Sequence, residues 1–170
     1  MSRTIRLSAA VSLDGFIAGP NGEIDWILMD PDIDFGELMG SYDTVLMGRK
    51  SYEDAAGMGG GPWSGMDTYV FSSTLEEARG VTLSRELEST VRRLKSRPGR
   101  DIWLFGGGSL FRSMLGLNLV DEVQVAVIPV LLGSGVPLLA PGVRAELSLY
   151  AHRLYPKTGT MMLEYRVKHG

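Results

Sequence analysis

The sequence contains no cysteine and only two histidines, and these two shortages remove several kinds of chemistry. Without cysteine the chain cannot form disulfides or use a thiolate. His152 lies in a strand-like stretch and His169 lies near the C-terminus, so we expect neither a zinc-hydrolase site nor a Ser-His-Asp triad. The acidic run Asp30-Pro-Asp32-Ile-Asp34 lacks the glycine and the closing glutamate of a calcium loop. We therefore expect no bound metal.

Long apolar runs and a large excess of charge are also missing. No run reaches the length of a membrane span, and Met1-Ser-Arg-Thr does not begin a signal peptide, so we expect no membrane contact and a cytoplasmic location. The net charge of −3 offers no basic footprint for nucleic acid. The remaining composition is ordinary, because 170 residues with 44% apolar and 22% charged side chains fit one globular domain over residues 1–170.

Strand-like and helical segments alternate along the chain. We expect strands at 4–13, 44–47, 68–72, 81–84, 101–105 and 122–132, and helices at 31–41, 51–56, 85–97 and 109–117. This alternation predicts an α/β domain with a mixed, mostly parallel sheet that helices cover on both faces. Residues 144–155 and 161–168 read as an antiparallel C-terminal hairpin.

Local signals refine this outline at three places. Asp30 is the expected N-cap of the helix at 31–41. Pro129 falls inside the strand at 122–132 and suggests an edge position or a bulge. Residues 57–65 are rich in glycine and read as a flexible loop.

A glycine-rich turn follows the strand at 101–105 and leads into a helix. The turn and the start of the helix comprise Gly106, Gly107, Gly108, Ser109 and Leu110. Amides at a helix N-terminus bind phosphate, and glycines let a ligand approach the backbone closely. Phe111 stands where the dinucleotide fingerprint has its third glycine, so the pattern is not that fingerprint. The alternative is a tight turn that binds nothing.

A second strand-to-helix turn carries cationic side chains. It consists of Gly48, Arg49, Lys50 and Ser51. It is not a P-loop, because the upstream glycine and the Gly-Lys pair are missing. An arginine at this position can pair with a phosphate, although a solvated basic helix start is the alternative. Ser72 and Ser73 follow the next strand and could bind the same ligand or serve as a cap. Two such turns suggest a dinucleotide.

In order along the chain, these pieces resemble the dihydrofolate reductase fold, and more closely the C-terminal reductase domain of riboflavin biosynthesis and its stand-alone relatives. The matching segments are residues 9–18, 25–26, 43–53, 70–73, 102–110 and 121–135, which span nearly the whole chain. The resemblance implies an NADPH-binding reductase that forms a homodimer through its C-terminal sheet region, where residues 123–132 are strongly apolar. It also implies a cis peptide bond between Gly106 and Gly107.

By position, the resemblance assigns roles to the residues of both turns. Gly48, Arg49 and Ser51 would hold the phosphates on the adenosine side, with Arg49 on the 2′-phosphate and Lys50 assisting. Ser72 and Ser73 would flank the adenine ribose, and the segment from Gly106 to Leu110 would hold the pyrophosphate. Ala10 and Ile17 would lie against the nicotinamide.

The substrate side departs from true dihydrofolate reductases. Asp25-Trp26 replaces their Pro-Trp, and Pro31 falls near the position of their substrate-binding acid, for which Asp30 or Asp32 is the expected substitute. Asp14 matches the Leu-Asp-Gly of the riboflavin-type relatives and could orient substrate, relay a proton or cap a turn.

Two further points bear on the substrate. Trp26 and Trp63 could each line a planar ligand or anchor a loop. The zinc deaminase activity of bifunctional riboflavin enzymes requires cysteines that this chain lacks.

We expect hydride transfer from NADPH to a C=N or C=O bond of a small pyrimidine- or pterin-like molecule. Two alternatives stay open. One is a nucleotide-binding module without catalysis, and the other is a riboflavin-pathway pyrimidine reductase acting alone.

Overall fold

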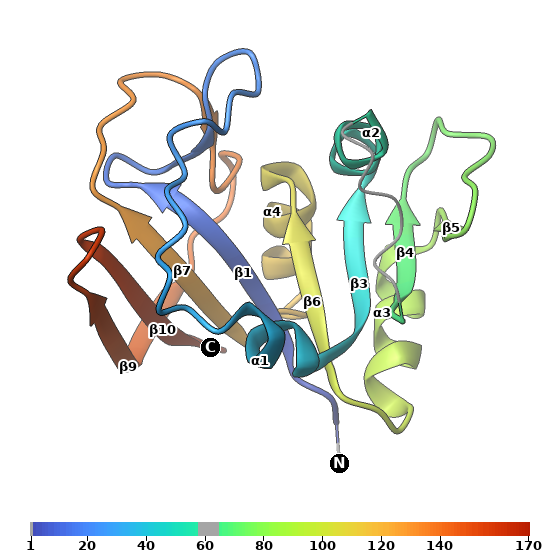
Figure 1. The fold of residues 1–170 in the computed structure, drawn as a ribbon. Helices are drawn as coiled ribbons and strands as arrows, with labels where there is room; N and C mark the ends of the chain where they lie inside the picture. Colours follow the sequence, from blue (N-terminus) through green and yellow to red (C-terminus); the bar gives the residue numbers. More distant parts are fainter. Residues whose placement is uncertain (1, 58–64) are drawn as a thin grey trace.

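A computed structural model describes residues 2–57 and 65–170 and shows a twisted eight-stranded sheet (Figure 1). The strand order is β5-β4-β3-β6-β1-β7-β10-β9. The strands are β1 (Ile5–Ser12), β3 (Tyr42–Gly48), β4 (Asp67–Phe71), β5 (Thr82–Ser84), β6 (Asp101–Gly106), β7 (Glu122–Ile128), β9 (Glu146–Tyr155) and β10 (Thr160–Lys168). All neighbours from β5 to β7 pair in parallel, and β10 pairs antiparallel with both β7 and β9. The predicted fold class and its closing hairpin are confirmed.

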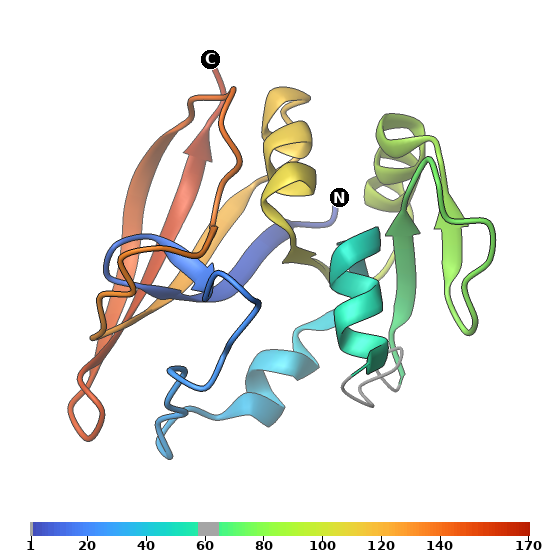
Figure 2. The same ribbon diagram turned by 90° about the horizontal axis from the view of Figure 1, so that it is seen from above.

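Helices cover both faces of this sheet. They are α1 (Phe35–Gly40), α2 (Arg49–Gly57), α3 (Leu87–Ser96) and α4 (Gly108–Gly116). Figure 2 shows α3 and α4 on one face and α1 and α2 on the other. A small second sheet joins β2 (Phe16–Ala18) to β8 (Val136–Pro137). None of the helices in the described ranges combines the length and the apolar character needed to cross a membrane.

Alternation along the strands builds two cores. In β1, Ile5 and Leu7 point to the α3 and α4 face and join the larger core. Trp103 of β6 belongs to the smaller core on the α1 and α2 face, and its register partner Arg6 points to that same face. Side chains of β1 from Arg6 through Ser8 to Ala10 therefore face the α1 and α2 side, where the candidate site lies.

The first helix is shorter than predicted. It begins at Phe35, and its N-cap is Asp34, whose Oδ1 accepts a hydrogen bond of 2.9 Å from the Glu37 amide. The prediction of a helix from Pro31 capped by Asp30 is wrong. Asp30 is buried instead, and its carboxylate accepts hydrogen bonds from Thr158 in the β9–β10 turn, a partner that local sequence does not reveal.

The expectation of an edge strand or bulge at Pro129 is also wrong. β7 ends at Ile128, so the proline follows the strand and removes no hydrogen bond from the pairing within it. β7 lies between β1 and β10, well inside the sheet.

A buried ion pair secures the amino-terminal end of the sheet. The Arg3 guanidinium bonds to the Asp43 carboxylate, to Thr44 Oγ1 at 2.8 Å and to the Arg100 carbonyl at 2.6 Å. The Arg3 side chain is only 6% exposed, so losing its partner would leave a charge buried without compensation. This cluster fixes the start of the chain against β3 and against the residues that lead into β6.

A second carboxylate connects two loops at the opposite edge. Asp14 accepts hydrogen bonds from Ser12 Oγ at 2.6 Å, from the Gly133 amide at 2.7 Å and from the Leu132 amide at 3.1 Å. The bond from Ser12, followed by that from Gly133, lowers the pKa of Asp14 from 3.8 to about 2. The segment after β1 is thereby tied to the segment after β7.

Asp43→Ala should lower the free energy of unfolding by about 3 kcal/mol, because it strands the buried Arg3 charge. Chemical denaturation measures this loss. Arg144→Ala is the matched control, since it breaks an exposed ion pair with Glu146 and should leave stability unchanged within error. Equal effects of the two substitutions would contradict the assignment.

Asp14→Asn should remove a pH-dependent part of stability. Because the pKa of Asp14 is lowered in the folded state, its contribution is present above pH 3.8 and is lost as pH falls through about 2. The difference in Tm between wild type and variant should therefore be largest at pH 5 and shrink toward pH 2. A difference that stays constant over this range would show that the carboxylate charge is not responsible.

Candidate functional site

Two strand-to-helix turns meet at the carboxyl edge of the parallel strands (Figure 1). β3 runs directly into α2 at Gly48 and Arg49, and β6 leads through Gly107 into α4. The Gly107 amide donates a 3.3 Å hydrogen bond to Ser51 Oγ, which joins one turn to the other. The two phosphate-binding segments predicted from the sequence are therefore neighbours in space.

The two turns direct the chain toward opposite sides of the sheet. After β3 it continues to β4 on one side, and after β6 it continues to β7 on the other, with α2 and α4 on opposite faces (Figure 2). Crevices at such a switch point, outside the carboxyl ends of parallel strands, are the usual ligand sites of open α/β sheets. The topology alone therefore marks this edge.

The N-terminus of α4 offers free hydrogen-bond donors. Its N-cap, Gly107, has no side chain to satisfy the first turn. The amides of Gly108, Ser109 and Leu110 have no acceptor within the helix, and none elsewhere in the part of the chain that the structure describes. Together with the positive end of the helix dipole, these amides have the chemistry that suits an anion, and their predicted phosphate binding stays a prediction.

The three glycines of this turn have different roles. Gly106 has a φ of +130°, which side-chain-bearing residues rarely adopt. At Gly108 an added Cβ would lie 3.0 Å from the Ala140 amide nitrogen, so the close packing of residues 137–140 requires glycine. At Gly107 an added Cβ would meet only Ser51 Oγ, at 3.6 Å. Gly107 therefore leaves its backbone open to a ligand.

The expected cis bond between Gly106 and Gly107 is absent. This peptide is trans, as are the others in the described ranges, and the prediction is wrong. The positive φ of Gly106 turns the chain between strand and helix instead.

The cationic turn is exposed and loosely engaged. Arg49 pairs with Glu53 at 3.0 Å one helical turn away, and both side chains are about half exposed. Such a pair is weak, so Arg49 can exchange Glu53 for a phosphate at little cost. Lys50 is exposed and makes no ion pair with any described residue.

The two serines after β4 differ in their surroundings. Ser72 Oγ accepts hydrogen bonds from the amides of Thr74 and Leu75, as expected of a turn cap. Ser73 is exposed, and its carbonyl accepts a 2.7 Å hydrogen bond from Arg85. Their expected roles beside a ribose stay predictions.

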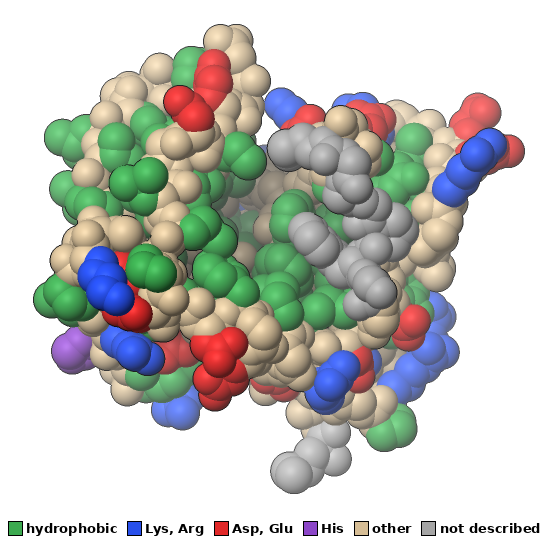
Figure 3. All heavy atoms as spheres, in the orientation of Figure 1, with side chains coloured by type: hydrophobic (Ala, Val, Ile, Leu, Met, Phe, Trp, Pro, Cys, Tyr) green, Lys and Arg blue, Asp and Glu red, His purple; other side chains and the backbone are tan. Residues whose placement is uncertain are grey.

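A hollow opens on the α1 and α2 face near the middle of the molecule, with hydrophobic side chains around it (Figure 3). On this face of the sheet Ala10 is half-buried and stands in register with Ala126 of β7. Ile17 of β2 is also half-buried. Their predicted contact with a nicotinamide stays a prediction.

The candidate substrate residues take part in hydrogen bonds of the fold. Asp14 is ionised at neutral pH because its pKa is about 2, so it suits orientation better than proton donation. Trp26 is half-buried and donates a 2.9 Å hydrogen bond to the Glu23 carbonyl. Trp63 lies outside the described residues.

Asp30 is 1% exposed, and its carboxylate accepts from the Asp32 amide and from both the amide and the hydroxyl of Thr158. Burial opposes ionisation of Asp30, but these hydrogen bonds and the nearby Lys157 lower its pKa overall. Asp30 therefore has a structural task, and its substrate role stays a prediction.

Sequence reasoning missed a polar row inside the sheet. Ser8, Gln124 and Glu164 stand in register on three neighbouring strands and face the α1 and α2 side. The sequence feature that could have revealed this row is Gln124, a polar residue within the apolar strand β7. Alternation along the strand places Gln124 on the same face as Glu122.

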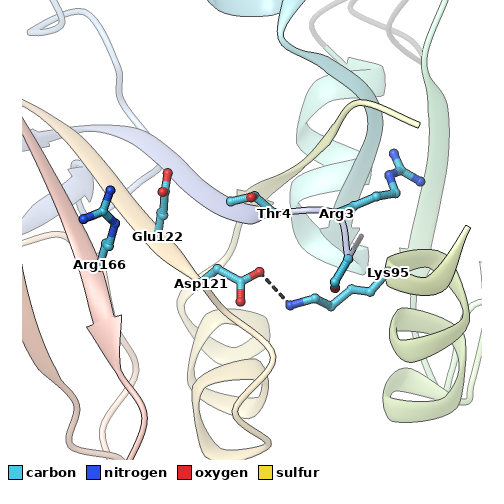
Figure 4. A pocket seen from close by; sticks show the side chains of 7 residues that line it. Arg3, Thr4, Lys95, Asp121, Glu122 and Arg166 are labelled. Atoms are coloured by element: carbon cyan, nitrogen blue, oxygen red, sulfur yellow. Dashed lines mark hydrogen bonds and ion pairs between the residues drawn. The ribbon is translucent and has the colours of Figure 1, made fainter. Parts of the chain in front are cut away.

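A pocket of about 270 Å³ lies at the opposite, amino-terminal edge of the sheet (Figure 4). Lys95 reaches across it to Asp121 at 2.6 Å, and Asp121 also accepts from the Ile5 amide. Arg3 contributes to its wall but is bound to Asp43. These charges satisfy one another, so this pocket belongs to the framework and lies away from the glycine turns.

Comparison with known proteins finds relatives of this chain both by sequence and by fold. The chain is 42% identical over 151 residues to an uncharacterised protein, YyaP, of Bacillus subtilis (strain 168), and the match covers 80% of each. A proposed riboflavin biosynthesis protein of Shewanella sp. PV-4 has the same fold, with a TM-score of 0.84 at 24% identity over 99% of this chain and all of that one.

Two further solved structures share the fold at 18% identity. One is a diaminohydroxyphosphoribosylaminopyrimidine deaminase/5-amino-6-(5-phosphoribosylamino)uracil reductase of Thermotoga maritima, with a TM-score of 0.74, 98% of this chain and 57% of that one covered. The other is dihydrofolate reductase of Enterococcus faecalis in complex with NADP(H) and RAB-propyl, with a TM-score of 0.73 over 99% of this chain and all of that one. The expected fold family is confirmed.

Residues 3–157 match the family described as the RibD C-terminal domain. The match covers most of the chain and includes both glycine turns and the strands that carry them. The chain therefore belongs to the RibD C-terminal domain family.

Proposed function

We propose that this protein is an NADPH-dependent reductase of a small pyrimidine- or pterin-like molecule. The observation that carries the proposal is the junction of the two turns, where the free amides of α4 lie beside Ser51 and the basic start of α2. Membership of a reductase-type family and the fold shared with an NADP(H)-binding dihydrofolate reductase support it.

The residues at this edge fit a dinucleotide with several phosphates. The amides of residues 108–110 would donate hydrogen bonds to the pyrophosphate oxygens, because they have no other acceptor in the described chain. Open space at Gly107 permits the close approach that such a ligand needs. Arg49, with Lys50 beside it, would hold a further phosphate, and the Ser51 hydroxyl stands between the two groups. Ser72 and Ser73 would lie beside the adenine ribose.

When bound, NADPH supplies a hydride to the carbon of a C=N or C=O bond, leaving NADP⁺, while the nitrogen or oxygen takes a proton from water. The chain itself binds and orients. Ala10 and Ile17 provide half-buried apolar surface for a planar ring, and Ala10 is small enough to let that ring approach β1. Asp14, ionised at neutral pH, holds the loops after β1 and β7 in place.

Loss of NADPH absorbance with a panel of cyclic imines, pterins and aminopyrimidine ketones tests the function. Turnover of at least one compound, with one NADPH consumed per bond reduced, is the expected result. Tight NADPH binding without turnover of any compound would instead favour a non-catalytic binding module. Turnover restricted to a ribosylaminopyrimidine phosphate would identify a riboflavin-pathway reductase acting alone, and absence of NADPH binding would overturn the proposal.

Arg49→Ala should weaken NADPH binding by about 10- to 100-fold and leave NADH binding nearly unchanged, because a charge-assisted bond to the 2′-phosphate is lost. Fluorescence titration measures both affinities. Arg92→Ala is the matched control, since Arg92 forms a similar exposed pair with Glu88 on α3. Equal losses for NADPH and NADH would show that Arg49 does not discriminate between them.

We also propose that the protein is a homodimer, with its interface on β9 and not on the apolar run at 123–132, which lies mostly within β7 inside the sheet. β9 is an edge strand whose Leu147, Leu149 and Leu154 are 38%, 49% and 54% exposed. A strand edge of this kind is a liability unless it is covered.

Light scattering should give twice the chain mass at micromolar concentration, and Leu149→Lys should shift the protein to monomer. Thermal unfolding of the variant at high concentration checks that it still folds. A monomeric mass for the wild type would contradict the dimer.

A further inference from the structure

Glu164 of β10 is a carboxylate on the α1 and α2 face of the sheet, one row of side chains away from Ala10 and Ala126. It stands in register with Gln124 of β7, which stands in register with Ser8 of β1. The next row toward the carboxyl edge comprises Ala10, Ala126 and Met162. From the spacings of strands and residues, Glu164 lies roughly 12 Å from Ala10 along the sheet, a span that a two-ring molecule can bridge.

A chain of hydrogen bonds holds this carboxylate in one orientation. Ser8 Oγ donates to Gln124 Oε1 at 2.9 Å, and Gln124 Nε2 donates to Glu164 Oε1 at 2.7 Å. Gln124 is only 7% exposed, so its amide cannot turn over without losing both contacts. Glu164 Oε2 has no hydrogen-bond partner among the described residues and keeps its acceptor capacity.

The cations on this face are engaged elsewhere. Arg166 lies two residues along β10, but its guanidinium stacks over the Tyr150 ring at 4.5 Å. Arg6 bonds to Glu122 at 2.7 Å. Glu164 is half-buried and forms no ion pair within the described ranges. Gln124 therefore satisfies one carboxylate oxygen, and Oε2 is left to accept an N–H from a ligand.

We propose that Glu164 is a specificity-determining residue that binds substrate through Oε2. Its ligand would be an amino heterocycle that presents adjacent N–H donors, as an amidine or aminopyrimidine edge does, because a carboxylate accepts such a pair in plane. This inference rests on the proposed function, since the ring system would extend from Glu164 toward Ala10. The sequence suggested Asp30 as the acidic residue that binds substrate, but its carboxylate already accepts hydrogen bonds from Thr158 and Asp32. In this proposal the carboxylate that binds substrate is therefore supplied by β10.

Glu164→Gln separates recognition from structure. The new side chain still accepts from Gln124 Nε2 through its carbonyl oxygen, and it loses only the negative charge. The probes are 2,4-diaminopyrimidine and 2,4-dimethoxypyrimidine, which differ in their N–H donors, and calorimetry measures each affinity with and without NADPH. Glu146→Gln, on the exposed part of β9, is the matched control.

Wild type should prefer the diamino compound, and Glu164→Gln should weaken its binding by about 10- to 100-fold while binding of NADPH and of the dimethoxy compound stays unchanged. Glu146→Gln should bind both probes as wild type does. Two results would overturn the role of Glu164 while leaving the proposed function intact, provided that wild type still binds NADPH. One is that wild type shows no preference for the diamino compound, and the other is that Glu164→Gln binds the diamino compound as tightly as wild type does. Loss of NADPH binding by wild type would instead overturn the proposed function.

Discussion

The pairing of β3 with β6 is the constraint on which the site depends. Because these parallel strands are neighbours, the helices that follow them begin at the same edge, one on each face of the sheet. The hydrogen bond from the Gly107 amide to Ser51 Oγ then fixes the distance between the two turns. Neither turn alone is specific for a phosphate, but two donor-rich turns at a switch point together fit the proposed ligand, which carries more than one phosphate group.

Charge is distributed unequally between the two edges of the sheet. At the amino-terminal edge, Arg3 and Lys95 are paired with Asp43 and Asp121 in contacts that are at least partly buried. At the carboxyl edge the helix amides have no acceptors in the described chain, and the Arg49 pair is exposed. The partly buried ion pairs of Arg3 and Lys95 therefore lie away from the site, and the amide donors that a ligand needs stay available.

Sequence patterns predicted the elements that depend on local periodicity. The parallel strands, the closing hairpin and both glycine turns follow from alternation and from glycine at strand ends, and the structure contains them. Errors arose where the deciding partner is distant in the chain. Asp30 looked like a helix cap, but it binds Thr158, 128 residues away. Pro129 suggested that its strand lies at an edge of the sheet, but β7 has β1 on one side and β10 on the other. The Gln124–Glu164 pair was invisible because its members lie on separate strands.

Two carboxylates hold the loops around the candidate site through main-chain donors. Asp14 binds the amides of Leu132 and Gly133, and Asp30 binds those of Asp32 and Thr158. Both have pKa values lowered in the folded state, so both are charged at neutral pH. The contacts of Asp14 with Gly133 and of Asp30 with Thr158 join segments that are distant in sequence. Glu164, whose Oε2 has no hydrogen-bond partner among the described residues, lies on a strand inside the sheet, where Gln124 orients it. A rigid strand thus presents the group best suited to recognise substrate, while the loop carboxylates maintain the shape around it.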